Sequence, residues 1–167
     1  GKPPIHLYTR SDACGAAETW AAFLGGHQED LKGIAIYGDP GLAEAVRQDP
    51  TGLGFNNLNF AYHPQTGKPH PGLAIGPLDL DGNGQLTPEE NFYGQRDELT
   101  LAISRGLYPS PPARNLYLVV KQPVKQILVR DFLLWVLDRG QQLAAEAGYL
   151  ALDQNLAQTE KQKLLEN

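Results

Sequence analysis

The stretch "PIHLYTRSDACGAAETWAAFLGG", residues 4–26, decides the expected fold. Its first part, residues 4–10, is short and apolar and lies between prolines and a polar turn, which is typical of a buried strand. After the turn, alanines and large apolar residues recur at helical spacing until Gly25 and Gly26. A strand that leads through a tight turn into a helix favours an α/β fold.

The composition is that of an ordinary globular protein. The chain has 167 residues, of which 41% are hydrophobic and 20% are charged, and this length suits one domain with a real core. The net charge of -5 argues against a surface for nucleic acid or an anionic membrane. One cysteine excludes an internal disulfide and a site of several thiolates. An anion site must therefore be local.

We expect no transmembrane segment in this sequence, and no signal peptide is visible in it. No apolar run approaches the ~20 residues that a membrane span needs. Methionine is absent, so we expect Gly1 not to be a native start and the chain to be part of a longer protein.

Further elements are expected along the chain, and strands that alternate with helices favour a mainly parallel or mixed sheet flanked by helices. Residues 1–167 are accordingly predicted to form a single α/β lobe. A helix is expected to start with Asp39 as N-cap and Pro40 at the first helical position, and to end before Pro50. The other predictions are strands at 51–62, 72–80 and 116–120, helices at 88–105, 124–138, 141–147 and 154–165, and an extended linker at 108–115.

The turn at residues 10–16 is a candidate anion-binding site. The first amides of a helix are unpaired and lie at the positive end of its dipole. Gly15 allows a ligand to approach the backbone, and Arg10 can make a two-pronged contact with phosphate or carboxylate oxygens. Asp12 can orient Arg10, cap the helix or accept a proton from a partly protonated oxyanion. The alternative is structural, with Asp12 as a cap and Arg10 in a surface ion pair.

Cys14 also has two interpretations. A thiol at a helix start beside an arginine can have a lowered pKa and act as a nucleophile. No histidine lies nearby in sequence, so a small buried side chain is the alternative, and we predict that the protein is not an enzyme.

These residues resemble a known family. "RSDACGAAETWAAFL", residues 10–24, is similar to the Arg-x-Asp-x-Ser-Gly-Thr segment of the periplasmic phosphate-binding proteins of ABC transporters. The similarity continues, in the family's order, through residues 41–62, 111–121 and 131–152. It implies the second lobe of a type 2 periplasmic-binding-protein-like fold, without the first lobe. It also implies a non-catalytic, solute-binding function that delivers inorganic phosphate to the transporter's permease subunits, and a periplasmic or cell-surface location.

The resemblance assigns phosphate contacts to Arg10, Asp12, Cys14, Gly15 and Ala16. Arg10, Asp12 and Gly15 match the family's arginine, aspartate and glycine. Cys14 stands where the family has serine, and Ala16 where it has threonine, so one hydroxyl donor is weakened and another is lost. Each lost neutral hydrogen bond costs about 0.5–1.5 kcal/mol, so phosphate or a similar oxyanion remains the expected ligand.

A second motif, "LDLDGNGQLTPEE" at residues 78–90, matches the calcium loop of an EF-hand. The side chains of Asp79, Asp81, Asn83 and Glu90 and the carbonyl of Gln85 are the expected calcium ligands. Gly84 permits the sharp turn of such a loop and Leu86 would anchor it to the core. Thr87 to Glu90 also form a capping box, so the loop is expected to end by starting a helix.

The calcium is expected to be structural, because a strand and not a helix precedes the loop. The alternative is an acidic turn whose aspartates bond their own backbone. Three functions therefore stay open: the solute-binding lobe, a secreted calcium-stabilised interaction module and a thiol-dependent enzyme. The four histidines show no ligand spacing, and we expect them to be ordinary solvated or packing residues.

Overall fold

The protein is described by a computed structural model that covers residue 1 and residues 3–165. The chain divides into two compact units, residues 1–114 and 115–167, and each is described by itself. The predicted α/β class is confirmed, since a small parallel sheet is flanked by helices. The assignment to a periplasmic-binding-protein-like lobe stays a prediction.

The first unit contains a parallel sheet in the order β2-β1-β3, with β1 (His6–Arg10) in the middle. Tyr8 and Arg10 pair with Ile34 and Ile36 of β2 (Ile34–Ile36), and Leu7 pairs with Leu53 of β3 (Gly52–Leu53). The central strand is the apolar run that the sequence predicted.

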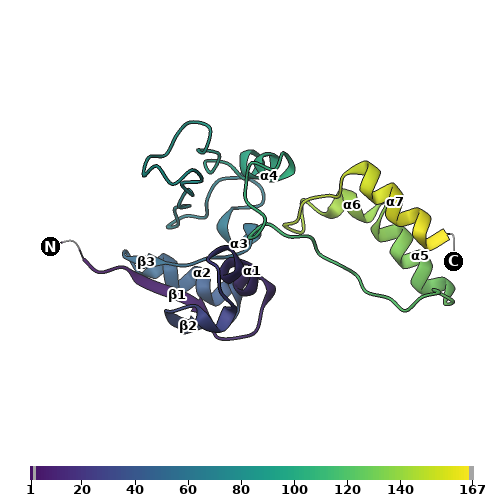
Figure 1. Ribbon diagram of the computed structural model, residues 1–167, viewed down its shortest axis with the longest axis horizontal. Helices are drawn as coiled ribbons and strands as arrows, with labels where there is room; N and C mark the ends of the chain where they lie inside the picture. Colours follow the sequence, from purple (N-terminus) through teal and green to yellow (C-terminus); the bar gives the residue numbers. More distant parts are fainter. Residues whose placement is uncertain (2, 166–167) are drawn as a thin grey trace. The chain divides into compact units, whose positions relative to one another are not determined.

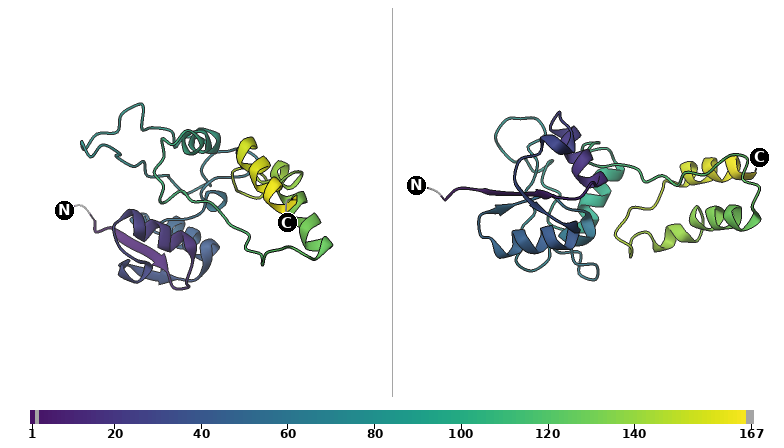
Figure 2. Two further views of the ribbon diagram at one scale, coloured as in Figure 1. Left: turned by 45° about the vertical axis from the view of Figure 1, so that its right-hand side comes forward. Right: turned by 90° about the horizontal axis from the view of Figure 1, so that it is seen from below.

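Two helices connect these strands. α1 (Gly15–Phe23) leads from β1 to β2 through the short 3-10 helix η1 (Gln28–Asp30), and α2 (Gly38–Gln48) leads from β2 to β3. Figure 2 shows α1 and α2 on opposite sides of β1. Ala17 and Ala21 of α1 and Leu42 of α2 are almost fully buried, which fits two helices that each cover one face of a sheet. α1 ends as predicted, with Gly25 in the left-handed region at φ +84°.

The rest of the first unit packs around a cluster of aromatic side chains. α3 (Leu58–Ala61) and α4 (Arg96–Ser104) border it, and the buried hydroxyl of Tyr62 donates a hydrogen bond of 2.9 Å to the backbone oxygen of Tyr93. The buried members of the cluster are Tyr62, Phe92, Tyr93, Leu99 and Ala102. Burial raises the pKa of Tyr62 to about 12, so this hydroxyl stays protonated over the physiological range.

The second unit consists of three helices after an extended segment. α5 (Ile127–Val136) packs against α6 (Gly140–Leu143) and α7 (Gln154–Leu165). Figure 1 shows α5 and α7 side by side, and Lys161 of α7 pairs with Asp138, with 2.7 Å between Nζ and Oδ1. The predicted helices at 124–138, 141–147 and 154–165 are therefore confirmed, with shorter bounds for the first two.

Several predicted elements were wrong. Residues 51–62 contain a two-residue strand and then α3, while residues 72–80 and 116–120 form no strand. Residues 88–90 are only a turn, and the helix predicted from 88 begins at Arg96. For the three predicted strands the physical reason is the same, because an apolar run forms a strand only where a neighbouring strand completes its hydrogen bonds.

The start of α2 also differs from the prediction. Tyr37 is the N-cap, without a capping side chain, and Asp39 lies inside the first turn. Asp39 instead accepts hydrogen bonds from Arg10 and from Asn57. The side chain of Asp39 is therefore fixed by contacts with residues distant in sequence and does not cap α2.

Candidate functional site

The carboxyl end of β1 is where the sequence placed the anion site. β1 ends at Arg10 and β2 ends just before α2, so in this parallel sheet the amino ends of α1 and α2 lie at the same edge. The connections from β1 to β2 and from β2 to β3 run to opposite sides of the central strand. Such a reversal at the carboxyl ends of strands is where open α/β sheets bind ligands.

Arg10 is held firmly at this edge. Its side chain is only 7% exposed. Nε donates to Oδ1 of Asp12 at 2.9 Å, Nη2 donates to Oδ2 of Asp12 at 2.5 Å, and Nη1 donates to Oδ1 of Asp39. An arginine has five N–H groups, so two remain beyond these three bonds. Arg10 is thus buried between two carboxylates and is not part of a surface ion pair.

Asp12 orients Arg10 and does not cap α1. Besides the two bonds from Arg10, its Oδ1 accepts a bond of 3.1 Å from the amide of Gly38, the first residue of α2. The hydrogen bonds from Arg10 and from this amide hold the pKa of Asp12 well below its usual range. Asp12 is therefore a fixed negative charge that ties β1 to α2.

Cys14 is the N-cap of α1. Its Sγ accepts a hydrogen bond of 3.3 Å from the amide of Ala17, and its own amide donates to the side-chain oxygen of Gln28 at 3.1 Å. Within the described part of the chain, no base hydrogen-bonds to this sulfur. The role of the thiol here is to satisfy a helix amide, while the non-catalytic prediction and its thiol-dependent alternative stay predictions.

The backbone amides of Gly15 and Ala16 are the candidate hydrogen-bond donors for a ligand at this edge. Among residues 1 and 3–165, no group accepts a hydrogen bond from either of their amides. The side chain of Arg114 lies directly over Gly15, because a Cβ on that glycine would be 2.5 Å from Nη1 and 2.7 Å from Cζ. In the same described residues, Arg114 forms no ion pair with a carboxylate. The guanidinium of Arg114 therefore lies close to the start of α1, where the first two amides of the helix are located.

The sequence analysis did not place Arg114 in the site. Nothing local in "YPSPPARN", residues 108–115, indicates a ligand contact, because the segment is far from Gly15 along the chain. The absence of a side chain on Gly15 is what admits the guanidinium so closely. Asp39, which the sequence suggested as a helix cap, is likewise part of this site through Arg10.

The second candidate site is the loop at residues 79–90. Carboxylate oxygens of Asp79, Asp81 and Glu90 lie within 4.8 Å of one another, and this cluster could hold a metal ion. Asp79 accepts hydrogen bonds from the amides of Gly82, Asn83 and Gly84, the shortest being 2.7 Å from Gly84. These bonds fold the chain tightly around the first carboxylate.

Glu90 closes the loop. It is buried at 7% exposure, and its Oε1 accepts a bond of 2.7 Å from the amide of Leu80, while its Oε2 accepts bonds from the amide and hydroxyl of Thr87. These donors lower the pKa of Glu90, so it is ionised at neutral pH. The predicted pairing of Thr87 with Glu90 is present, but it closes a turn and not a helix.

The other predicted members of the loop are less clearly placed for a metal. The side-chain oxygen of Asn83 accepts from the amide of Gln85 at 2.7 Å, and its nitrogen donates to Asp81. The prediction that Leu86 anchors the loop to the core was wrong, because Leu86 is 44% exposed. The ends of the loop lie next to the core instead, because the amide of Leu78 donates a hydrogen bond of 3.3 Å to the hydroxyl of Tyr93, and the buried Phe92 and Tyr93 follow Glu90 closely.

The sequence analysis did not predict a polar network at the amino end of β1. Asp49 accepts hydrogen bonds from the hydroxyl of Tyr8 at 2.9 Å and from the amide of Thr51, and it lies 2.6 Å from Nδ1 of His6. The Asp-Pro-Thr turn after α2 was the available signal, since aspartates in turns bond the backbone two residues on. This network fastens the end of α2 to the central strand.

No helix among the described residues is both long and apolar enough to cross a membrane. Comparisons with protein-family models, with curated proteins and with solved structures find no match to the chain. The resemblance to phosphate-binding proteins of ABC transporters therefore stays a prediction.

Proposed function

We propose that this chain binds a small tetrahedral oxyanion, inorganic phosphate foremost, as the non-catalytic solute-binding component of an ABC importer. The observation that supports the proposal is the set of unpaired donors at the start of α1. The amides of Gly15 and Ala16 lie there, after the carboxyl end of the central strand, and the guanidinium of Arg114 lies beside Gly15.

Some groups at this edge would donate hydrogen bonds to the anion, and others fix the orientation of those donors. The two amides donate at the positive end of the helix dipole, and the planar fork of Arg114 suits two oxygens of one anion. Arg10 offers its two remaining N–H groups while Asp12 and Asp39 fix its orientation. These carboxylates also repel a fully charged anion, which favours a form that still carries a proton. The side chains of Cys14 and Ala16 add no strong donor.

An importer's binding protein must signal that it is loaded. A ligand that bridges two lobes stabilises a closed state, which the permease subunits distinguish from the open one. The present chain supplies the donors of one lobe, so we expect its own phosphate affinity to be weak. A periplasmic or cell-surface location belongs to the same proposal.

The test is a titration of the ¹⁵N-labelled chain with inorganic phosphate, followed by NMR. The amide signals of Gly15 and Ala16 should shift in a saturable manner, and Arg114→Gln should weaken the binding while Arg105→Gln, an exposed arginine at the end of α4, should not. Sulfate, which carries no proton at neutral pH, should bind less well. Shifts that spare Gly15 and Ala16 while appearing elsewhere would contradict the proposal, as would tight micromolar binding that Arg114→Gln leaves unchanged.

A second candidate function is a calcium-stabilised interaction module. It is favoured by the convergence of Asp79, Asp81 and Glu90 in a loop with the EF-hand pattern. Calcium takes six to eight oxygens, so two aspartates, a bidentate glutamate, Asn83 and the carbonyl of Gln85 would suffice. Stabilisation by calcium together with no binding of phosphate or sulfate would favour this function over oxyanion transport.

A further inference from the structure

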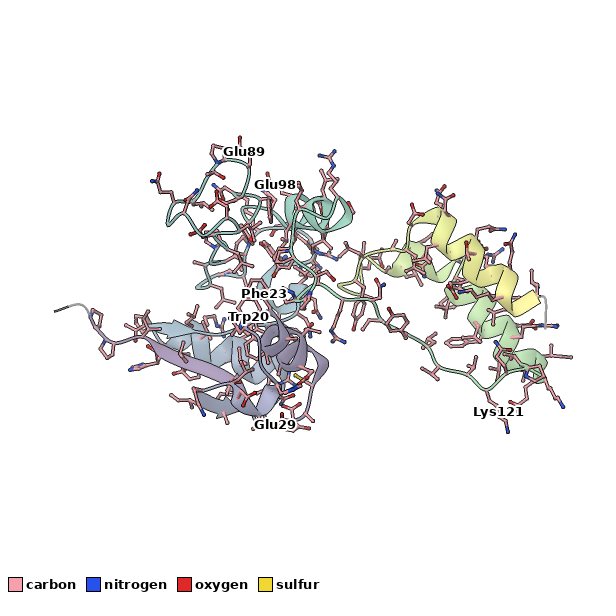
Figure 3. The ribbon with its side chains drawn as sticks, viewed as in Figure 1. Trp20, Phe23, Glu29, Glu89, Glu98 and Lys121 are labelled. Atoms are coloured by element: carbon pink, nitrogen blue, oxygen red, sulfur yellow. The ribbon has the colours of Figure 1, made fainter. Side chains whose placement is uncertain are left out.

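The turn that leads from β1 into α1 is bridged by the side chain of Gln28. This residue belongs to η1, whose middle residue, Glu29, is labelled in Figure 3. Nε2 of Gln28 donates a hydrogen bond of 2.8 Å to the backbone oxygen of Asp12, and Oε1 accepts a bond of 3.1 Å from the amide of Cys14. Both bonds involve one planar carboxamide, so they fix the relative position of the two backbone groups. Gln28 therefore closes the turn across Ala13.

The carboxamide of Gln28 replaces a neighbouring strand at this turn. In a parallel sheet, a residue donates to and accepts from the two backbone groups that flank one residue of the adjacent strand. Gln28 makes the same pair of bonds to the groups that flank Ala13. Among the described residues, no strand pairs with residues 12–14. The direction in which the chain enters α1 therefore depends on this one side chain.

The backbone of η1 is itself attached to the first turn of α1. Oε2 of Glu18 accepts a hydrogen bond of 3.0 Å from the amide of Gln28, and Oε1 lies 3.2 Å from Nδ1 of His27. These contacts lower the pKa of Glu18, so it is ionised at neutral pH and accepts both. The segment around Gln28 is thus bound to the start of α1 on one side and to the turn before it on the other.

This arrangement sets the direction of the candidate donors. Gly15 and Ala16 directly follow Cys14, and their amides begin α1. A hydrogen bond weakens steeply as its angle departs from linearity, so a rotated turn would misalign these amides without removing them. The amide of Cys14 is occupied by Gln28 and does not face a ligand. Gln28 therefore affects both which amides remain for a ligand and where they point.

We propose that Gln28 is the positioning residue of the oxyanion site. Its carboxamide orients the amides of Gly15 and Ala16 and leaves these two, and not the amide of Cys14, for the ligand. The identity of the ligand rests on the proposed function, whereas the orientation of the amides is measurable without any ligand.

Residual dipolar couplings of the free ¹⁵N-labelled chain measure that orientation. Gln28→Met keeps the length of the side chain and removes both hydrogen bonds. We expect the couplings of Gly15 and Ala16 to change relative to that of Trp20, which lies in the same helix. Gln65→Met, at an exposed glutamine in another loop, is the control. Couplings of Gly15 and Ala16 that keep their wild-type values in Gln28→Met would overturn the proposal.

Titration with inorganic phosphate measures the effect on binding. Gln28→Met should weaken the saturable shifts of the Gly15 and Ala16 amides about tenfold, which is the usual size of an effect from one or two hydrogen bonds. Equal affinity of the wild type and Gln28→Met, with shifts at these two amides, would overturn the positioning role and leave the oxyanion proposal intact. A wild-type chain whose amides do not respond would overturn the oxyanion proposal, and the dipolar couplings would still decide the role of Gln28.

Gln28→Glu adds a pH-dependent readout that a merely structural role would not move. A carboxylate still accepts from the amide of Cys14, but it cannot donate to the oxygen of Asp12 and it repels that oxygen. Protonation restores the donor, so phosphate affinity relative to the wild type at the same pH should be about tenfold lower at neutral pH and should recover in part at about pH 4.5. Gln65→Glu is the matched control for the added charge and should bind as the wild type does at both pH values. A relative affinity of Gln28→Glu that does not rise with acid would contradict the positioning role.

Discussion

Arg10 and Asp12 form a two-pronged ion pair across a single intervening residue, with hydrogen bonds of 2.9 and 2.5 Å from the guanidinium to the two carboxylate oxygens. The pair lies at the turn from β1 to α1, and Asp12 continues to the first amide of α2. It therefore joins the central strand to the start of a second helix. This pair therefore fixes the geometry of the turn between β1 and α1.

Because of this pair, the free energy of unfolding of the first unit should decrease at acid pH. The folded-state pKa of Asp12 lies below its unfolded value, so its contribution is fully present above about pH 4 and is lost as the pH falls further. Asp12→Asn should make the unfolding midpoint of the first unit less sensitive to pH in this range. The measurement is urea unfolding followed by the fluorescence of Trp20 in a Trp135→Phe background. Asp49, whose pKa is also lowered, should leave some acid sensitivity in the variant.

The exposed Asp131, replaced by Asn, is the matched control for this experiment and should leave the pH dependence unchanged. Trp20 is a suitable reporter because it stacks on Phe55, with centroids 6.3 Å apart, and Figure 3 labels it on α1 beside Phe23. An Asp12→Asn protein with the full acid sensitivity would contradict the ion-pair argument.

The substitution Gly15→Ala should weaken phosphate binding and leave the free energy of unfolding almost unchanged. The new Cβ would meet the guanidinium of Arg114, which is the end of a flexible side chain and can move away. We expect the free energy of unfolding to change by less than about 1 kcal/mol, because alanine is the better helix former. Phosphate binding, measured by the NMR titration, should weaken because Arg114 is displaced. Unchanged phosphate affinity with unchanged stability would show that Arg114 does not contact the ligand.

Cys14→Ser should stabilise the first unit. Serine is a strongly preferred N-cap, and its oxygen is a better acceptor than sulfur for the amide of Ala17. We expect a gain of about 0.5–1 kcal/mol in the free energy of unfolding, and a loss of similar size for Cys14→Ala. The urea midpoint measures both. In parallel, Cys14 should be alkylated no faster than free cysteine at neutral pH, and a markedly faster reaction would revive the thiol-dependent hypothesis.

Calcium removal should destabilise the first unit. The loop at 79–90 lies between Leu78, whose amide donates to Tyr93, and the buried Phe92, so an ion that offsets most of the charge of the three carboxylates should also stabilise the aromatic core. We expect a chelator to lower the thermal midpoint and added calcium to restore it. For an extracellular module the affinity should be about 10⁻⁴–10⁻³ M.

The variants Asp79→Asn and Glu90→Gln should abolish the response to calcium. Glu89→Gln is the matched control, since Glu89 is exposed and adjacent to Glu90 but outside the cluster. Melting curves that coincide with and without chelator would contradict the prediction that calcium stabilises this protein.

The sequence alone predicted features that depend on neighbours along the chain. β1, the end of α1 at Gly25 and α7 were predicted correctly, because apolar periodicity and a glycine stop are local signals. The turn from Arg10 to Gly15 and the loop from Asp79 to Glu90 were predicted as candidate sites for the same reason.

Only the tertiary structure decided what each group contacts. It placed Asp39 on Arg10 and Arg114 over Gly15, and it left residues 116–120 without a neighbouring strand. Hydrogen bonds and ion pairs between distant residues depend on how the chain returns to the same place, and local composition does not encode that return. A strand in particular requires a second strand to pair with, whereas a helix completes its bonds within its own segment.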